Sequence, residues 1–330
     1  MDYLLGFIIL LLKIGLMLGG LLLAASYLVW LERKLLARLQ VRLGPNRAGI
    51  FGLLQPIADA IKLLCKEDIV PARADPPIFR LAPAVVALTA LLMFAVVPLG
   101  PDVRVLGRPV PMLISDLNVG LLFVFALSSL GVYGVALGGW ASNSKFALLG
   151  GIRGAAQMIS YELALGLSLV PVVMLAGSFS LTAIVDAQAG VPFIVLQPVS
   201  FAIFVISAMA ESKRIPFDLP EAENELGAGF HMEYSGMRFG LYFLGEYVHI
   251  QVLGALTAVF FLGGWRGPWL PPLVWLMLKI FIVALIMIWV RGTLPRLRYD
   301  QLMAVGWKVL IPAALINIVL TGVFIQVAMR

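Results

Sequence analysis

Eight long apolar stretches constrain the fold of this chain more than any other feature of its sequence. A helix that crosses the hydrocarbon core of a bilayer, about 30 Å thick, needs roughly 20 apolar residues. Stretches of this kind lie at about 3–31, 80–98, 118–140, 154–177, 192–210, 239–264, 271–291 and 309–328. They are continuous, as in "VVALTALLMFAVVPLG", whereas the strands of a membrane β-barrel alternate. We therefore expect an all-α membrane protein, in which residues 1–330 form one transmembrane domain, a polytopic bundle of eight helices.

Few residues of the chain suit a redox centre. Cys65 is the single cysteine, so this chain alone forms neither an internal disulfide nor a cysteine-ligated iron–sulfur cluster. The two histidines, His231 and His249, allow at most one bis-histidine haem, and His231 lies outside the predicted spans. No glycine-rich dinucleotide motif follows a strand. We predict no metal site and no redox cofactor bound by this chain itself.

The basic residues predict the orientation of the spans. Lys and Arg collect on the cytoplasmic side of membrane proteins. Of the 24 in this chain, 18 fall in the first, third, fifth and seventh connections between spans, and 3 in the others. We therefore expect a multi-pass membrane protein whose odd connections are cytoplasmic and whose termini are both on the outer side.

The first cytoplasmic connection, residues 32–77, combines a basic collar with a predicted interfacial helix. Apolar side chains recur at helical spacing on one side of the helix and polar ones on the other, with Pro56 tolerated in its first turn. The helix is interpreted either as a membrane-surface anchor or as one wall of an entrance for a lipid-like substrate. The collar comprises Arg33, Lys34, Arg38, Arg42 and Arg47, the apolar side Leu53, Leu54, Ile57, Ile61 and Leu64, and the polar side Asp59, Lys62 and Lys66.

Glu162 stands out because it falls two to three turns inside a predicted span that starts near Arg153 or Gly154. A carboxylate at that depth is costly unless it is paired, hydrated or neutralised. It is therefore either a proton carrier or a structural partner of a neighbouring polar side chain. The seventh connection, "RGTLPRLRYDQLMAVGWK", is interpreted mainly as a positive-inside signal, with no chemistry beyond docking.

The fifth connection, residues 211–238, inverts the expected charge. Residues 211–246 hold seven acids against three bases. Apolar residues and prolines alternate with the acids in "IPFDLPEAENELGAGF", which favours a packed loop over a solvated one. A divalent-metal site lacks the spacing of an EF-hand, and a docking patch for basic partners stays compatible with other roles. The functional hypothesis is a buried, hydrated group of acids that exchange protons as a coupled set.

Three segments carry a family resemblance: "ERKLLARLQVRLGPNRAGIFGLLQPIADAIKLLCKEDIVP", "WASNSKFALLGGIRGAAQMISYELALG" and "ESKRIPFDLPEAENELGAGFHMEYSGMRFGLYFLGEY". They resemble the H-subunit family of the bacterial respiratory NADH:quinone oxidoreductases (complex I), the equivalent of the first mitochondrially encoded membrane subunit. The resemblance covers the whole chain in order. It implies a protein at the junction of the peripheral and membrane arms, which forms much of the chamber through which ubiquinone or menaquinone enters.

The resemblance also assigns residues by match. Arg33, Arg42 and Asp59 would lie at or near the quinone chamber, and Arg214 and Tyr247 at its junction with a proton relay. His231 would add a group that titrates near neutrality. The relay towards the antiporter-like subunits would comprise Glu162, Glu211, Asp218, Glu221, Glu223, Glu225, Glu233 and Glu246.

The resulting hypothesis is a subunit of a proton-pumping translocase that couples quinone reduction to proton translocation. Quinone is then the substrate, while NADH, FMN and iron–sulfur clusters belong to partner subunits, and no nucleic acid is involved. The span at 118–140 carries no carboxylate between Gly120 and Trp140, so a proton route must use other spans or other chains. The alternatives are a purely structural anchor for the peripheral arm, a secondary transporter, which would show inverted repeats, and the equivalent subunit of a membrane-bound hydrogenase or related dehydrogenase.

Overall fold

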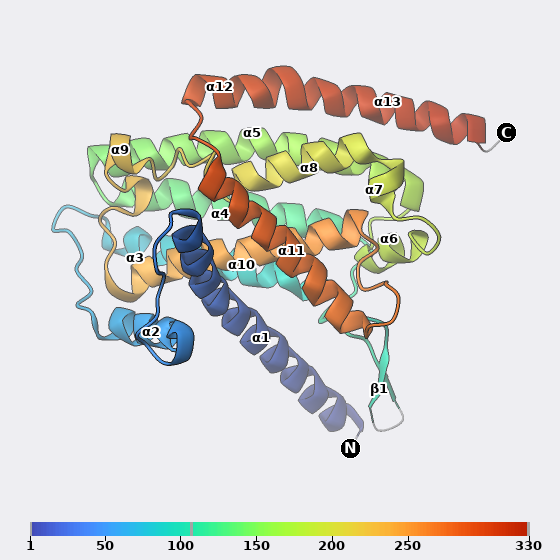
Figure 1. Cartoon of the computed structure of the whole chain (residues 1–330), viewed down its shortest axis with the longest axis horizontal. Helices are drawn as coiled ribbons and strands as arrows, with labels where there is room; N and C mark the ends of the chain where they lie inside the picture. Colours follow the sequence, from blue (N-terminus) through green and yellow to red (C-terminus); the bar gives the residue numbers. More distant parts are fainter. Residues whose placement is uncertain (1, 106–107, 329–330) are drawn as a thin grey trace.

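The computed structural model describes residues 2–105 and 108–328, and its long elements are all helices (Figure 1). Within these residues seven helices are long and apolar enough to cross a membrane. This confirms the predicted all-α polytopic architecture. The seven are α1 (Asp2–Leu39), α3 (Pro76–Met93), α4 (Gly120–Ala141), α5 (Lys145–Ala176), α10 (Gly236–Phe261), α11 (Pro272–Thr293) and a last helix that joins α12 (Tyr299–Ala304), a π-helical turn (Val305–Leu310) and α13 (Ile311–Ala328).

The eighth predicted span, 192–210, is present as two shorter helices, α7 (Phe193–Leu196) and α8 (Pro198–Glu211). The break falls at Gln197 because Pro198 has no backbone N–H and disfavours helical geometry in the residue before it. The Gln197 side chain donates to Thr321 Oγ1 at 3.0 Å and accepts from Asn317 Nδ2 at 3.0 Å. These bonds tie the interruption to α13.

The connecting elements collect at opposite ends of the bundle. In Figure 1, α2 (Gln55–Cys65) and α9 (Glu223–Leu226) lie at one end, and α6 (Leu181–Ala187), α7, the β-hairpin and both chain ends lie at the other. The hairpin pairs β1 (Val103–Val105) with β2 (Arg108–Val110), antiparallel, with Val103 opposite Val110. Short 3₁₀ turns lie at Ile50–Gly52, Phe94–Val96 and Gly229–His231. The first and fifth connections therefore share one end, as the orientation analysis expects.

Two helices extend beyond the apolar stretches that predicted them. Helix α1 continues to Leu39, so Arg33, Lys34 and Arg38 lie on the helix itself. Helix α5 begins at Lys145, which places Glu162 nearly five turns from its start, at about 3.6 residues a turn. The predicted depth of two to three turns inside the membrane span stays a prediction, because hydropathy marks only the apolar part of a helix, while backbone hydrogen bonding continues into its polar end.

Helix α10 is the centre of the bundle. In the most apolar 18-residue segment of α10, 83% of the residues are buried, against 11% in that of α1 and 17% in that of the last helix. It carries apolar residues on every side, as expected of a helix with neighbours all round, with a few polar residues such as Glu246 and His249 among them. Phe204 of α8 packs against Phe260 and Phe261 near its end. Charged residues on α10 are therefore held inside the protein, whereas α1 and α13 leave apolar surface uncovered by this chain.

Candidate functional site

The acidic connection is a packed loop. Between the end of α8 and the start of α10, Phe217, Leu219 and Phe230 are buried. Gly229 adopts φ +60°, and a Cβ there would lie 1.7 Å from the carbonyl oxygen of Pro220, so only glycine fits. The side-chain amide of Gln157 on α5 donates to the carbonyl oxygens of Ala210 and Phe217, both at 2.6 Å. The loop is thus fixed against the helices.

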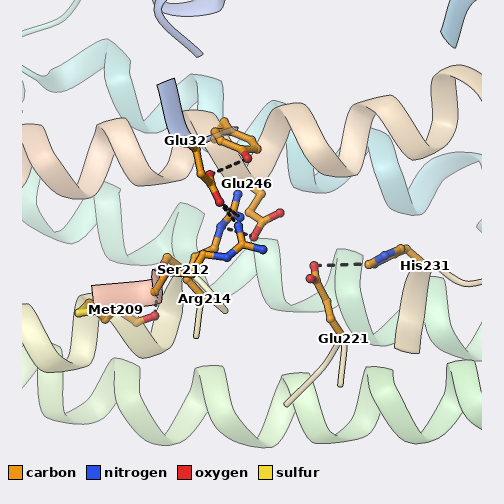
Figure 2. Close-up of polar contacts among 9 residues, drawn as sticks. Glu32, Met209, Ser212, Arg214, Glu221, His231 and Glu246 are labelled. Carbon is orange, nitrogen blue, oxygen red and sulfur yellow. Dashed lines mark hydrogen bonds and ion pairs between the residues drawn. The ribbon is translucent and has the colours of Figure 1, made fainter. Parts of the chain in front are cut away.

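A tight turn after α8 directs Arg214 into the bundle. The Ser212 hydroxyl donates to the carbonyl oxygen of Met209 at 2.8 Å, and Lys213 follows with φ +56°. The next residue, Arg214, then points away from α8 towards Glu32 and Glu246 (Figure 2). Lys213 is itself buried, with its ammonium 5.1 Å from the centre of the Phe230 ring.

Arg214 is the hub of a buried group that we call the ion-paired cluster: Glu32, Arg214, Glu246, Tyr247 and Arg291. The guanidinium lies 3.2 Å from Glu32 Oε1 and 2.8 Å from Glu246 Oε1. The Tyr247 hydroxyl donates to Glu32 Oε2 at 2.7 Å, and its ring lies 4.5 Å from the Arg214 guanidinium (Figure 2). Arg291 of α11 also donates to Glu32. The charges of the two carboxylates and the two guanidinium groups sum to zero. Charges inside a bundle are tolerated when they are paired in this way.

Two further carboxylates on the helices, the half-buried Glu162 and the buried Glu211, have a different kind of partner. Ser128 of α4 donates to Glu211, and the adjacent Ser129 donates to Glu162. Among the described residues no Lys or Arg forms an ion pair with either one. We call this pair the hydroxyl-bonded acids. The span without a carboxylate, α4, therefore contributes hydrogen-bond donors to both.

His249 and a small cavity lie beside Glu211. The His249 Nε2 atom is 3.7 Å from Glu211 Oε1 and has no hydrogen-bond partner among the described residues. The cavity, of about 30 Å³, is lined by Glu211, Lys213, Glu246 and His249, together with Ser128. A space of roughly 10–15 Å³ holds one water when polar partners surround it. The cavity is therefore large enough for water between the two carboxylate groups.

The acids of the loop differ widely in their surroundings. Asp218 is buried and pairs with Arg296 at 2.8 Å, and Glu221 lies 3.9 Å from His231 Nδ1. Glu225 is half exposed and pairs with Arg153 at 2.6 Å. Glu233 forms no ion pair with another described residue, and the Glu223 side chain lies outside the described part of the structure. The predicted relay residues thus do not form one uniform group.

Burial shifts the pKa values of three ionisable side chains in the acidic loop. It raises the pKa of Glu221 to about 8, helped by the nearby charges of Glu246 and Asp218. Burial also raises the pKa of Asp218, although Arg296 opposes the shift. The pKa of His231 falls to about 4 because of burial and the adjacent Lys213. His231 is therefore neutral at pH 7, and the expectation that it titrates near neutrality is wrong.

The first connection forms a helix where an interfacial helix was predicted. Helix α2 has Pro56 in its first turn, contributes no buried residue, and leaves Ile57, Ile61 and Leu64 exposed. Asp59 accepts hydrogen bonds from Arg33 at 2.6 Å and from Gln55 at 2.9 Å, which ties α2 to α1. Arg42 is exposed and pairs with no other described residue. Of the three residues of this connection that were predicted at or near the chamber, Arg33 and Asp59 therefore form an ion pair, and Arg42 is separate from them.

Several residues of the site escaped the sequence analysis. Arg291 and Arg296 belong to the seventh connection, for which no chemistry beyond docking was expected, yet they pair with Glu32 and Asp218. That expectation is wrong because the connection folds back over the acidic loop, where the Leu297 N–H donates to the Pro216 carbonyl at 3.1 Å. Glu32 was also overlooked, although a single acid at the start of a basic collar is a detectable inversion of charge.

The family of the chain follows from comparison with known proteins. The model of a family described as NADH dehydrogenase matches residues 12–322. The chain belongs to this family. It is 74% identical over 320 residues to an NADH-quinone oxidoreductase H subunit of Syntrophobacter fumaroxidans, with 97% of each chain covered. It is 61% identical to the corresponding H subunit of Syntrophotalea carbinolica, with 98% of each covered, and 65% identical to one of Geobacter metallireducens, with 94% of each covered.

Proposed function

We propose that this member of the NADH dehydrogenase family is the membrane subunit of a proton-translocating NADH:quinone oxidoreductase. In this role it forms much of the quinone-access chamber and couples quinone reduction to proton movement. One observation carries the proposal. Buried carboxylates come from α1, α8, α10 and the acidic loop, and two of them, Glu211 and Glu246, line one small cavity next to the rest of the ion-paired cluster. Charged groups placed inside a bundle at this cost are functional by default.

The quinone chamber is assigned to the region where α1, α2 and the ion-paired cluster meet. The exposed apolar side of α2 would guide the isoprenoid tail from the bilayer, and the Arg33–Asp59 pair would hold α2 in place against α1. Arg42 lies on the same connection, and Arg214 with Tyr247 would stand where the chamber meets the carboxylates.

The proton relay is assigned to the acids in two tiers. The hydroxyl-bonded acids and Glu246 border or adjoin the cavity and form the inner tier. Asp218 and Glu221 form the outer tier, because burial raises the pKa of Asp218 and raises the pKa of Glu221 to about 8. Glu223, Glu225 and Glu233 complete the proposed relay at the loop surface, and the exposed Glu225–Arg153 pair gives Glu225 the weakest support.

Electrostatics supply the coupling. Quinone reduction creates negative charge, or a demand for protons, at the end of the chamber. At an effective dielectric near 20, a unit charge about 8 Å from a carboxyl group is worth roughly 2 kcal/mol, enough to move its pKa by about 1.5 units. Such a change redistributes protons among carboxyl groups of similar affinity.

The remaining components follow from the same assignment. Electrons would arrive from peripheral-arm subunits that carry FMN and iron–sulfur clusters, and protons would leave towards antiporter-like subunits of the membrane arm. The membrane would be the bacterial inner membrane, with the acidic loop in the cytoplasm and both termini on the periplasmic side, as the basic residues indicate.

The test replaces single relay acids by glutamine in the assembled complex. Glu211→Gln and Glu162→Gln keep a hydrogen-bond acceptor for Ser128 and Ser129 but lose the proton. We expect assembly to be normal and coupled NADH:quinone turnover to fall at least about tenfold, since a positioned acid–base group is typically worth 10²–10⁴ in rate.

Glu225→Gln is the matched control, because it removes a carboxylate that is exposed and ion-paired at the surface. Its turnover and proton translocation should stay near wild type. Unchanged coupled activity in both deep variants would overturn the relay. A loss of assembly without a loss of turnover per assembled complex would instead favour a structural anchor for the peripheral arm.

A further inference from the structure

Lys213 is a buried cation to which the proposed relay assigns no role. It is 6% exposed and lies in the tight turn after α8, where its backbone adopts φ +56°. Of the two buried cations in the described part of the chain, Lys213 and Arg214, Arg214 is ion-paired with Glu32 and Glu246. The Lys213 ammonium forms neither an ion pair nor a hydrogen bond with another described residue. Its charge is therefore not committed to one carboxylate.

Two acids near Lys213 lack a cation of their own. The charges of the ion-paired cluster sum to zero, and so do those of Asp218 and Arg296. Glu211 and Glu221 are left, and neither forms an ion pair with a Lys or Arg among the described residues. An ionised carboxylate inside a protein is costly unless an opposite charge lies nearby. Lys213 is the buried cation that remains for both acids.

Lys213 lies between the cavity and the acidic loop. It lines the cavity together with Glu211, and on the loop side, where burial raises the pKa of Glu221 to about 8, the Lys213 charge opposes that rise. The described residues of α3, α4 and α5 add no ionisable side chain to the cavity wall. The ionisable side chains around Lys213 are Glu211 from α8, Glu246 and His249 from α10, and Arg214, Glu221 and His231 from the loop.

The charge of Lys213 and the charges of the acids depend on one another. Burial lowers the pKa of Lys213, and the negative charges of Glu246 and Glu221 oppose this shift. The cation in turn favours the ionised form of each nearby carboxyl group. A lysine ammonium is a compact charge on a flexible stem with three rotatable donors, so it can change its carboxylate partner while the backbone stays in place.

We propose that Lys213 is the shared counter-cation of the relay, a positioning residue that links the outer tier to the inner tier. The ammonium stabilises whichever of Glu221 and Glu211 is ionised, so that protonation of one acid favours ionisation of the other. This inference rests on the proposed proton relay and adds to it a residue that is not an acid.

The experiment measures the pH dependence of NADH:quinone turnover in the assembled complex. Lys213→Asn removes the cation, and asparagine tolerates the left-handed backbone better than lysine. Without the cation the ionised acids are less stable, so the part of the profile where turnover increases with pH should move to higher pH. The expected shift is about one pH unit, for a unit charge about 8–10 Å away at an effective dielectric near 20. Turnover should therefore fall about tenfold below this part of the profile and stay unchanged above it.

Three further variants separate the charge of Lys213 from its structural effects. Lys213→Arg keeps the cation and should keep the wild-type profile. Lys213→Gly also fits φ +56° without strain, and should show the same shift as Lys213→Asn. Lys66→Asn is the matched control, because it removes an exposed lysine at the same end of the bundle, and it should keep the wild-type profile.

Amide hydrogen exchange of residues 212–235 gives a second measurement that does not depend on turnover. The loop loses stability as pH rises and Glu221 releases its proton. In Lys213→Asn this loss should extend to higher pH, because Glu221 keeps its proton longer without the cation. Normal mobility of the complex on a native gel shows that each variant is assembled.

Two results would overturn the role of Lys213. The first is a wild-type profile in Lys213→Asn and Lys213→Gly while Glu211→Gln loses turnover, which would leave the relay itself unaffected. The second is a loss of turnover by the same factor at every pH, with unchanged hydrogen exchange, because a purely structural lysine acts in that way. Unchanged turnover in Glu211→Gln and Glu162→Gln would instead overturn the relay, and this inference with it.

Discussion

The ion-paired cluster and the hydroxyl-bonded acids each contribute one carboxylate to the same small cavity, Glu246 and Glu211, yet the carboxylates of the two groups have opposite kinds of partner. Glu246 lies 2.8 Å from the guanidinium of Arg214, and Glu32 contacts both Arg214 and Arg291. Glu211 and Glu162 accept instead from the neutral hydroxyls of Ser128 and Ser129. A nearby cation favours the ionised form of a carboxyl group, whereas a hydroxyl can reorient when a carboxylate gains a proton.

The difference separates structural from mobile charge. A buried ion pair is costly to break because the remaining charge is left without a partner. A carboxylate bonded to hydroxyls beside a water-sized cavity can change its protonation with small local rearrangement. We infer that the ion-paired cluster sets the geometry of the site, and that within the inner tier the hydroxyl-bonded acids change protonation more readily than Glu246. Four predictions test this division, in order of expected effect.

Arg214→Met should be the most destructive change. It leaves Glu246 without its cation and removes one of two cations from Glu32, a loss of about 3–5 kcal/mol. The assembled complex should be scarce in membranes and inactivate at a much lower temperature. Arg33→Met is the control, since it breaks the partly exposed pair with Asp59. Equal damage from both variants would contradict the division.

Replacing a glutamate by glutamine should destabilise the protein more in the ion-paired cluster than among the hydroxyl-bonded acids. Glu246→Gln removes a charged partner of Arg214 and should cost about 1.5–3 kcal/mol, the value of hydrogen bonds to charged groups. Glu211→Gln keeps an oxygen that accepts from Ser128, so its cost should be smaller, about 1 kcal/mol or less. Thermal inactivation of the two assembled variants gives the comparison. A larger loss in Glu211→Gln would reverse it.

Glu221→Gln should alter the pH dependence of loop stability. The folded pKa of Glu221 is about 8 against an ordinary value of 4.5, so between these values the folded loop binds more protons than the unfolded one. Stability therefore falls as pH rises through this window. Amide hydrogen exchange of residues 212–235, corrected for its intrinsic pH dependence, should show a shallower fall in Glu221→Gln. An unchanged slope would assign the dependence to other groups.

Arg153→Gln should have the smallest effect. Its ion pair with Glu225 is one-third to one-half exposed, and exposed pairs contribute about 0–1 kcal/mol. Both thermal stability and turnover should stay close to wild type. A loss of stability as large as that of Glu246→Gln would show that the Arg153–Glu225 pair matters as much as the ion-paired cluster, and would contradict the placing of Glu225 at the loop surface of the proposed relay.

The spans were predictable from the sequence, and so was the unusual acidity of the loop. Continuous apolar runs need no tertiary information, since a bilayer imposes their length. The break at Gln197 could have been suspected from Pro198, but its bonds to Thr321 and Asn317 join segments more than a hundred residues apart.

The partners of the acids were not predictable in the same way. Asp218 and Glu225 look alike in the sequence, and only the folding of the loop makes one buried and the other half exposed. Glu32 was hidden by its basic neighbours, and Arg291 by the general excess of Lys and Arg in its connection. Charge counts describe a segment as a whole, whereas pairing depends on which helices meet.

Infrared difference spectroscopy of the assembled complex tests the central claim most directly. Spectra recorded before and after quinone reduction report carboxyl groups that gain or lose a proton through the carbonyl stretching band of the protonated acid. The account predicts a band that disappears in Glu211→Gln and persists in Glu225→Gln. A band that is identical in wild type and Glu211→Gln would contradict it, because Glu211 would then keep its proton state while quinone is reduced.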